Sequence, residues 1–421
     1  MKEINIEDSK SQVIVKEEAK TKETPKKVDE TLPTEPIAKV IKESNLGFII
    51  MIIVGSLVSL GALAFLYFFV IKLPVSTSDI ISLSGNYISP NSVTLTQSLG
   101  TISVPDVPKT EASPINGLLF TKAEMATLMK RRPVAVTISN VNWARPQSGL
   151  YKADLVYETV VESGITRFMA IFWSQGPTKV GPVRSARQYF LEWLSPFDPI
   201  FIHDGCASTS DPRTNACGNI VLYGIKNNSL HGYWMDPTRV RPHNEYNSVV
   251  GAWDYAKTTG WTGFPKDFEA WKFKKDASYD QRGDRTKVKI RYRNDIPNGG
   301  LYDTMWIYNK DTNLYTHYTD GIKDTDLDTK TPITAKTVIV EEVVMPPYSD
   351  EKGRVVITTI GQGNATILMD GKIIHGKWKK DSRTDRTKYY DNAGAELSLN
   401  RGVVWINAVS KDKGTFDIIE Q

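Results

Sequence analysis

Residues 132–173 read RPVAVTISNVNWARPQSGLYKADLVYETVVESGITRFMAIFW, and this stretch holds the apolar runs around which the rest of the chain is interpreted. Residues 133–139 form a short apolar run that ends at the turn-forming Asn140, and residues 168–173 form a second run without a charge. Both runs predict buried strands. Residues 154–163 fit either a strand or a helix, because their apolar side chains fall at both spacings.

Strand and helix patterns alternate around this stretch, which predicts an α/β domain over residues 116–250. Thr121 and Glu124 have the spacing of a capping box at the start of a short helix. Further elements are predicted as a helix at residues 185–194 and as strands at residues 199–203 and 220–223.

Beyond residue 285 the pattern changes to β. Alternating or β-branched runs predict a mainly antiparallel β domain over residues 285–421, joined to the first domain by residues 251–284 with a helix near 251–258. The two domains are each long enough for a core of their own. The predicted strands are residues 287–292, 305–308, 314–317, 337–344, 355–360, 365–369, 372–377 and 403–408.

Residues 46–71 contain no charged side chain over twenty-six positions, which makes about 39 Å of helix and predicts one transmembrane span. A buried core helix or a cleaved signal peptide fits this run less well, because it lacks a polar stripe and exceeds the length of a signal core. Four Lys residues within twenty positions before the span predict an uncleaved signal anchor with a cytoplasmic N-terminus. Residues 1–45 are then a disordered cytoplasmic tail, and the Ser/Thr/Pro-rich residues 72–115 an extracytoplasmic linker.

Charge is close to balanced, with 52 basic and 48 acidic residues, so composition does not indicate nucleic-acid binding. Arginine is concentrated, however: nine Arg and three Lys occur from Arg131 to Arg241, whereas Lys predominates afterwards. Arginine is favoured where a planar group must hold a carboxylate or phosphate, so this region is where a site is expected.

The only two cysteines, Cys206 and Cys217, flank ten residues. In an exported domain such a pair predicts a disulfide that closes a small loop. A cysteine nucleophile or a metal pair is the alternative.

Gly181–Arg187 carries the strongest local signal. The expected strand–turn–helix order places Arg184 and Arg187 at a helix start, where backbone N–H groups and guanidinium groups favour an anion. Arg145 and Arg167 are expected to converge on the same place. The alternative is a structural network in which these arginines pair with carboxylates, namely Asp154, Glu158 and Glu162.

A second signal is Arg241-Pro-His243-Asn244, which joins the candidate ligand-binding residues. With His203 and Asp204 it supplies groups that bind zinc or run acid–base chemistry, although each histidine also fits a structural role. No dedicated metal spacing, phosphate loop, dinucleotide fingerprint or Cys-x-x-Cys motif occurs, so no metal and no cofactor are predicted.

Several motifs together resemble the YerB-like family of bacterial envelope proteins, which is defined by a domain of unknown function. They are Ala144–Gly149, Ala153-Asp154, Tyr157-Glu158, Gly164–Phe168, Gly181–Arg187, Arg241–Asn244, Gly361–Gly363, Asp370-Gly371, Gly376–Trp378 and Leu399-Asn400. Many members resemble lipoproteins, whereas this chain is expected to use a helix as its anchor. The resemblance brings no agreed catalytic residues.

The resulting hypothesis is a single-pass cell-membrane protein whose extracytoplasmic domain binds an anionic envelope ligand, such as a phosphorylated lipid carrier or wall polymer. One alternative is an enzyme acting on such a polymer, with His203, Asp204 or His243 as general base or metal ligand and Glu158 or Glu162 as its partner. Another is a scaffold whose β domain docks a second envelope protein. The expected partners are thus the lipid bilayer, the anionic ligand and an envelope protein.

Overall fold

The computed structural model describes residues 94–97, 100–103, 107–284, 287–295 and 300–419. The predicted tail at 1–45 and the predicted span at 46–71 lie outside the described residues, as does much of the predicted linker. Within the described ranges, no helix combines the length and apolar character that crossing a bilayer requires.

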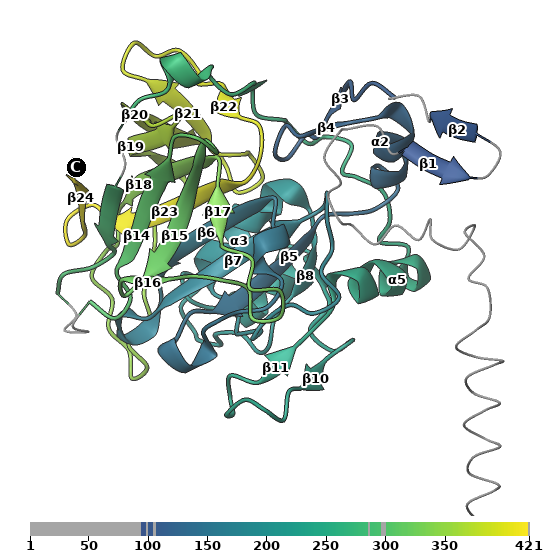
Figure 1. The fold of residues 1–421 in the computed structure, drawn as a ribbon. Coiled ribbons are helices and arrows are strands. Elements are labelled where there is room, and N and C mark those ends of the chain that lie inside the picture. The colour runs from purple at the N-terminus through teal and green to yellow at the C-terminus, as the bar shows by residue number, and fades with distance from the viewer. Residues whose placement is uncertain (1–93, 98–99, 104–106, 285–286, 296–299, 420–421) are drawn as a thin grey trace, which may run out of the picture. The chain divides into compact units, whose positions relative to one another are not determined.

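A ten-stranded mixed sheet forms the body of the molecule (Figure 1). Its strands, in spatial order, are β21 (Lys388–Asp391), β20 (Lys372–Lys380), β19 (Gly361–Met369), β18 (Thr337–Val343), β23 (Val404–Ser410), β6 (Leu155–Val160), β7 (Thr166–Phe172), β5 (Val134–Ser139), β8 (Ile200–Ile202) and β9 (Lys226–Asn227).

The middle of this sheet is parallel where the two predicted domains meet. Strand β23 pairs in parallel with both β18 and β6, whereas β6, β7 and β5 pair antiparallel. Parallel strands are normally covered on both faces, and every residue of β23 and β6 is buried. Residues 116–250 and 285–421 therefore share one sheet and one hydrophobic core, contrary to the expectation of two separate cores.

A second, antiparallel sheet covers one face of β6 and β23. Trp306 of this sheet lies against Trp405 of β23, with ring centroids 5.2 Å apart. The sheet consists of β16 (Ile322–Lys323), β15 (Leu314–Thr319), β14 (Thr304–Asn309), β13 (Lys287–Arg291) and β24 (Thr415–Ile419), with β17 (Thr334–Ala335) also paired to β15.

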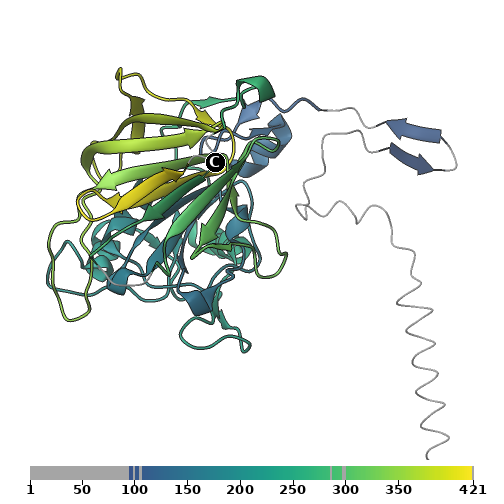
Figure 2. The same cartoon turned by 60° about the vertical axis from the view of Figure 1, so that its left-hand side comes forward.

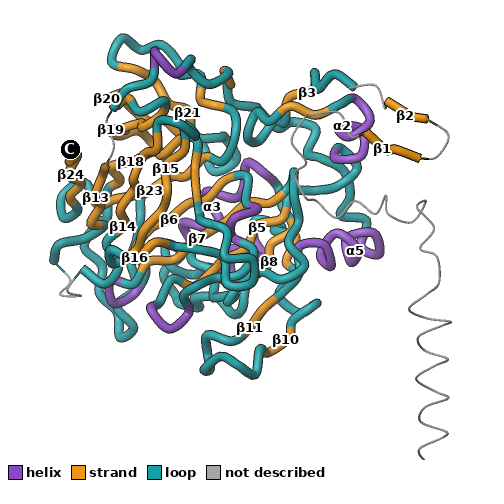
Figure 3. The backbone as a smooth tube through the Cα atoms, viewed as in Figure 1, coloured by secondary structure: helices purple, strands orange, loops and turns teal. Residues whose placement is uncertain are grey.

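Helix α3 covers the opposite face, and the described helices are all short (Figure 3). The ring of Trp193 in α3 stacks on Tyr157 of β6 at 4.9 Å. Because side chains alternate along a strand, Tyr157 faces α3 while the next residue, Glu158, faces the second sheet. The described α-helices are α2 (Lys122–Leu128), α3 (Gln188–Leu194), α4 (Ala216–Leu222) and α5 (Val249–Thr259).

The short remaining strands pair locally or tie segments together. Strand β12 (Phe273–Lys274) pairs in parallel with β22 (Leu399–Asn400), which attaches the predicted connecting segment to the C-terminal part. The others are β1 (Thr94–Gln97) with β2 (Gly100–Ser103), β3 (Glu111–Ala112) with β4 (Leu119–Phe120), and β10 (Trp234–Met235) with β11 (Glu245–Tyr246).

Several predicted elements need correction. Residues 220–223 belong to helix α4 and its C-cap, because Asn215 caps a helix that begins at Ala216. Residues 355–360 form no strand. The helix expected at 185–194 begins at Gln188, which leaves Arg184 in the extended segment before it. The ambiguous residues 154–163 contain strand β6, and the capping box of Thr121 and Glu124 is present.

Candidate functional site

Three of the predicted arginines, Arg167, Arg184 and Arg187, gather where β5 ends and β7 begins. Ser139, the last residue of β5, lies opposite Arg167 in the antiparallel register. The segment 181–187 runs alongside, since the Arg184 N–H donates to the Thr137 carbonyl at 2.9 Å. The segment after β8 follows next, because the Asp204 N–H donates to the Arg184 carbonyl at 3.1 Å. Loops beyond the carboxyl ends of parallel strands, here β5 and β8, are where α/β sheets commonly place ligands.

Arg187 is held by a carboxylate. Its Nε and Nη2 donate to the two oxygens of Glu162 at 2.5 and 2.7 Å, a bidentate pair that is mostly buried. Its Nη1 donates to the Ala186 carbonyl at 2.8 Å. Burial alone would lower the pKa of Arg187, but the hydrogen bonds and charge of Glu162 outweigh it and raise that pKa. Arg187 therefore has the structural role that was the alternative prediction.

Arg167 and Arg184 are held differently. Arg167 is 7% exposed, and its Nη1 donates to the Ser185 carbonyl at 2.6 Å. Arg184 donates through Nη1 to the Pro242 carbonyl at 3.3 Å, and its Nε is buried without a partner. Within the described ranges neither guanidinium makes a salt bridge. Burial and the neighbouring charges of Arg187 and Arg184 lower the pKa of Arg167 to about 9.

Polar and acidic groups complete this cluster. His243 lies 3.2 Å from the Ser139 hydroxyl through Nδ1, and burial with the charges of Arg184 and Arg167 lowers its pKa to about 4. Glu245 is buried, and its burial and its contact with Asp204 raise its pKa to about 8. At pH 7 His243 is neutral and Glu245 is largely protonated. We call Ser139, Arg167, Arg184, Asp204, His243 and Glu245 the arginine cluster.

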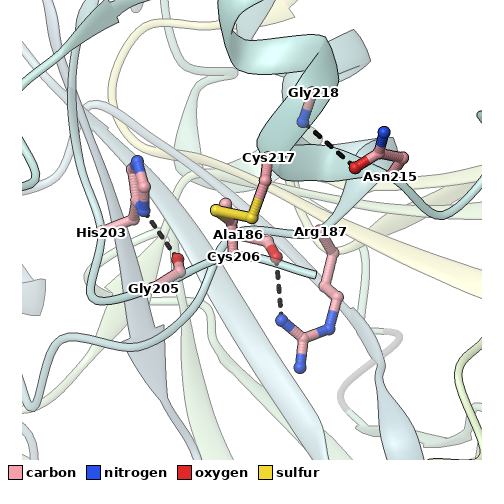
Figure 4. The surroundings of a disulfide bond; sticks show 8 residues. All are labelled: Ala186, Arg187, His203, Gly205, Cys206, Asn215, Cys217 and Gly218. Atoms are coloured by element: carbon pink, nitrogen blue, oxygen red, sulfur yellow. Dashed lines mark hydrogen bonds between the residues drawn. A yellow bond between two sulfur atoms is a disulfide. The ribbon is translucent and has the colours of Figure 1, made fainter. Parts of the chain in front are cut away.

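The disulfide borders the cluster. Cys206 and Cys217 are bonded, which joins the segment after β8 to helix α4. Figure 4 shows Arg187 and His203 on either side of the bond. His203 is buried and its Nδ1–H donates to the Gly205 carbonyl at 2.7 Å, so this histidine holds the turn.

Comparison with known proteins identifies the family. Residues 120–262 match the model described as the "Protein of unknown function (DUF3048) N-terminal domain", and residues 295–406 match its C-terminal domain. The chain is 33% identical over 314 residues to "Putative lipoprotein YerB" of Bacillus subtilis, covering 73% of this chain and 88% of that protein. This chain belongs to the DUF3048 family. The crystal structure of YerB protein from Bacillus subtilis superposes with a TM-score of 0.61 at 30% identity, covering 73% of this chain and all of the other.

Every predicted site residue falls in the DUF3048 N-terminal segment, but the structure does not bring all of them together. Arg145 donates to the carbonyls of Asn140 and Leu301 at 3.1 and 2.8 Å and faces the ring of Tyr302, which places it beside the second sheet. Asn244 is buried, and its amide donates to the Asp236 carbonyl. Arg241 is exposed to solvent.

A buried hydrogen-bond network joins the two DUF3048 segments, and no sequence motif indicates it. His317 of β15 donates through Nε2 to Glu158 at 3.0 Å and through Nδ1 to Asp324 at 2.6 Å. Trp405 and Thr304 also donate to Glu158, at 3.0 and 2.9 Å. Burial would lower the pKa of His317, but the two carboxylates outweigh it and raise that pKa to about 9.

Glu158 therefore serves this internal network and not acid–base chemistry beside His203 or His243. The partners of Glu158 are 146 to 247 residues away in the sequence, so no local motif could have pointed to them. Across the described residues, His, Cys, Asp and Glu form no group of three suited to a metal ion.

Two cavities lie away from the arginine cluster. One, of about 640 Å³, is lined by residues that include Lys274 and Asp370. The Asp370 carboxylate is already occupied there, since it accepts from Lys274, Asn313 and Asn400. The other, of about 370 Å³, is lined by Arg293, Arg354 and Lys413 among others, and acidic neighbours pair with all three cations.

Proposed function

We propose that this DUF3048 protein is a membrane-anchored envelope protein that binds an anionic ligand at the arginine cluster. The observation that carries this proposal is the pair of guanidinium groups, Arg167 and Arg184, which donate to backbone carbonyls and make no salt bridge within the described part of the chain. Arginine in such a position retains N–H donors for a phosphate or carboxylate.

The charges of the site favour an anion. Three guanidinium groups, including that of Arg187, face the carboxylates of Glu162 and Asp204. Glu245 adds no charge at pH 7 because its pKa is raised to about 8, and His243 adds none because its pKa is lowered to about 4. Arg167 and Arg184 are thus positive groups without a salt bridge among the described residues, and their burial strengthens their attraction for an anion.

Two separate observations support the proposed location in the cell envelope. The relative from Bacillus subtilis bears the name "Putative lipoprotein YerB". The sequence of this chain predicts a single membrane span at residues 46–71 with everything after Lys72 outside. Protease added to intact spheroplasts should therefore digest the region from Asn116 onward. Protection of that region would contradict the proposed orientation.

The binding proposal is tested on the full chain in detergent, with pyrophosphate as the probe. Arg184→Gln removes one charge-assisted donor worth about 1.5–3 kcal/mol, so the affinity for pyrophosphate should fall about tenfold to a hundredfold. Pyrophosphate should raise the melting temperature of the wild type and not that of this variant. Arg354→Gln is the matched control, since Arg354 pairs with Asp350 elsewhere in the molecule. A wild type that ignores pyrophosphate and other anions would contradict the proposal.

An enzyme is the second candidate, and Glu245 is the observation in its favour. A carboxyl that keeps its proton at pH 7 beside an anion-holding arginine has the properties of a general acid. Deprotonation of Glu245 near pH 8 would add a negative charge beside Arg184 and weaken anion binding. As pH rises through 8, anion affinity should fall more steeply in the wild type than in Glu245→Gln, whose amide cannot ionise, while loss of the Arg167 charge near pH 9 weakens binding in both. Equal pH profiles would remove the support for an acid at this position.

The scaffold alternative has less support. Exposed large apolar side chains in the described C-terminal residues come from five different segments, at Leu301, Ile322, Val344, Ile360 and Ile419.

A further inference from the structure

Strands β10 and β11 belong to a segment at the lower edge of the folded ribbon in Figure 1, and this segment stays at the lower edge in the turned view of Figure 2. Its inner side packs on the body, since the Val183 N–H donates to the Glu245 carbonyl at 2.7 Å and Tyr246 is fully buried. Among the described strands the two pair only with each other. We define the arm as residues 228–246, which comprise the approach to β10, both strands and the loop between them.

The arm exposes large apolar side chains. Leu230 is 86% exposed, Val240 76%, Met235 49% and Trp234 38%. Trp143 from the neighbouring loop adds a fifth, 60% exposed, and its ring lies 5.8 Å from that of His243. Exposed apolar side chains gathered on one short surface segment mark an interaction surface, since single exposed apolar residues are usually scattered.

The charges of the arm identify the kind of partner. Arg241 is exposed, and Arg239 lies nearby with its guanidinium donating to the carbonyls of Trp143 and Pro146. The one acidic residue near the tip, Asp236, already pairs with Lys179 at 3.3 Å. Tryptophan and aliphatic side chains combined with arginine are characteristic of segments that enter the interface of an anionic bilayer.

The arm is continuous with the arginine cluster. Pro242, near its tip, accepts from Arg184, and Glu245 in β11 belongs to the cluster itself. A bilayer touching the exposed apolar side chains would therefore bring lipid phosphates to the side of the molecule where Arg184 lies. This region belongs to a chain whose residues 46–71 are expected to span a membrane.

We propose that the arm inserts Leu230, Trp234 and Val240, with Trp143, into the interfacial layer of an anionic bilayer, and that the ligand of the arginine cluster is a lipid phosphate. This inference rests on the proposed function for its ligand, but the insertion of the arm is measured separately from anion binding.

The test uses the full chain in vesicles of phosphatidylglycerol whose acyl chains carry bromine, a short-range quencher of tryptophan fluorescence. All ten tryptophans lie after residue 140, so the predicted span contributes no signal. We expect brominated vesicles to quench part of the fluorescence, with bromine near the headgroup more effective than bromine deep in the chains. That part should be lost in the Trp143→Phe, Trp234→Phe double variant, which keeps apolar rings but removes the two exposed fluorophores.

A matched pair of variants then assigns the contact. Leu230→Ser should reduce the quenching, whereas Ile322→Ser, a similar change at a 68% exposed residue of β16, should leave it unchanged. Equal fluorescence in brominated and plain vesicles, or equal quenching in the double variant, would overturn insertion of the arm. Pyrophosphate stabilisation in detergent distinguishes this failure from failure of the binding proposal, because that measurement needs no bilayer.

Discussion

At the scale of single residues, the arginines that the sequence presents as one motif divide into two kinds. Arg187 is engaged at both ends of its guanidinium by Glu162, whereas Arg184, three residues earlier, donates to a backbone carbonyl. The spacing alone cannot separate them, because the partner of Arg187 is 25 residues away in the chain. Only the folded arrangement shows that Arg187 is paired with a carboxylate, whereas Arg184 is available to the ligand that we propose.

Arg187→Gln should therefore destabilise the protein. The change leaves the mostly buried carboxylate of Glu162 without its bidentate partner, which should cost about 3 kcal/mol of the free energy of unfolding and lower the melting temperature by about 5–10 °C. Arg184→Gln should lower it by only a degree or two. A thermal melt of the two variants checks this. Equal losses of melting temperature would contradict the conclusion that Arg187 contributes more to stability than Arg184.

His317 is the residue whose protonation matters most for the core. Both of its ring nitrogens donate to carboxylates, so the charged form is the one that fits. The folded pKa, raised to about 9, lies above the unfolded value of about 6.5, so stabilisation by this proton is complete below pH 6.5 and is lost as pH rises through 9.

We expect His317→Gln to lower the melting temperature by about 10 °C, because Glu158 and Asp324 lose the charge between them. The loss of stability between pH 6.5 and 9 should also become shallower in the variant than in the wild type. His375→Gln is the control, since His375 is exposed on β20. If the stability of the variant falls with pH as steeply as that of the wild type, another group titrates in this range.

At the scale of elements, the disulfide attaches α4 to the strand-like segment that carries Asp204 and Cys206. Closing a loop of eleven positions should contribute about 3 kcal/mol to stability in the loop-entropy description. Blocking thiols in denaturant and weighing the protein should give no adducts until a reductant is added. Two adducts without reductant would mean free thiols.

The elements also show where sequence patterns were sufficient. Strand β5 and the hairpin of β14 and β15 were predicted because their apolar side chains alternate or run without charge. The prediction for 220–223 was wrong because four apolar or aromatic residues fit a strand as well as a helix. The deciding signal was the Asn215 cap, five residues earlier.

The site was predictable to a similar degree. The motifs Gly164–Phe168, Gly181–Arg187 and Arg241–Asn244 indicated the segments that meet around Arg184, because turn and arginine signals are local. The separate position of Arg145 was not predictable, since it depends on Leu301 and Tyr302 in the other half of the chain. Nor was the network of Glu158, which exists only because β6 and the second sheet face each other.

At the scale of the whole molecule, residues 107–419 should unfold as one unit. The two family segments are joined through β6 and β23, and Glu158 of the first segment is buried against His317 of the second. Calorimetry should show one transition for this region, and a fragment ending at residue 284 should fail to fold because β6 loses a neighbour on one side. Two separate transitions would restore the picture of independent domains.

The position of β23 also constrains how the protein is made. The Thr159 hydroxyl donates to the Ala408 carbonyl, its neighbour across the sheet, from 249 residues away. Synthesis proceeds from the N-terminus, so β6 leaves the ribosome long before the strand that completes its edge exists. Until residues 404–410 follow, that edge is an unpaired template for other chains. We therefore expect a stop codon shortly before Val404 to yield aggregate instead of a shortened fold.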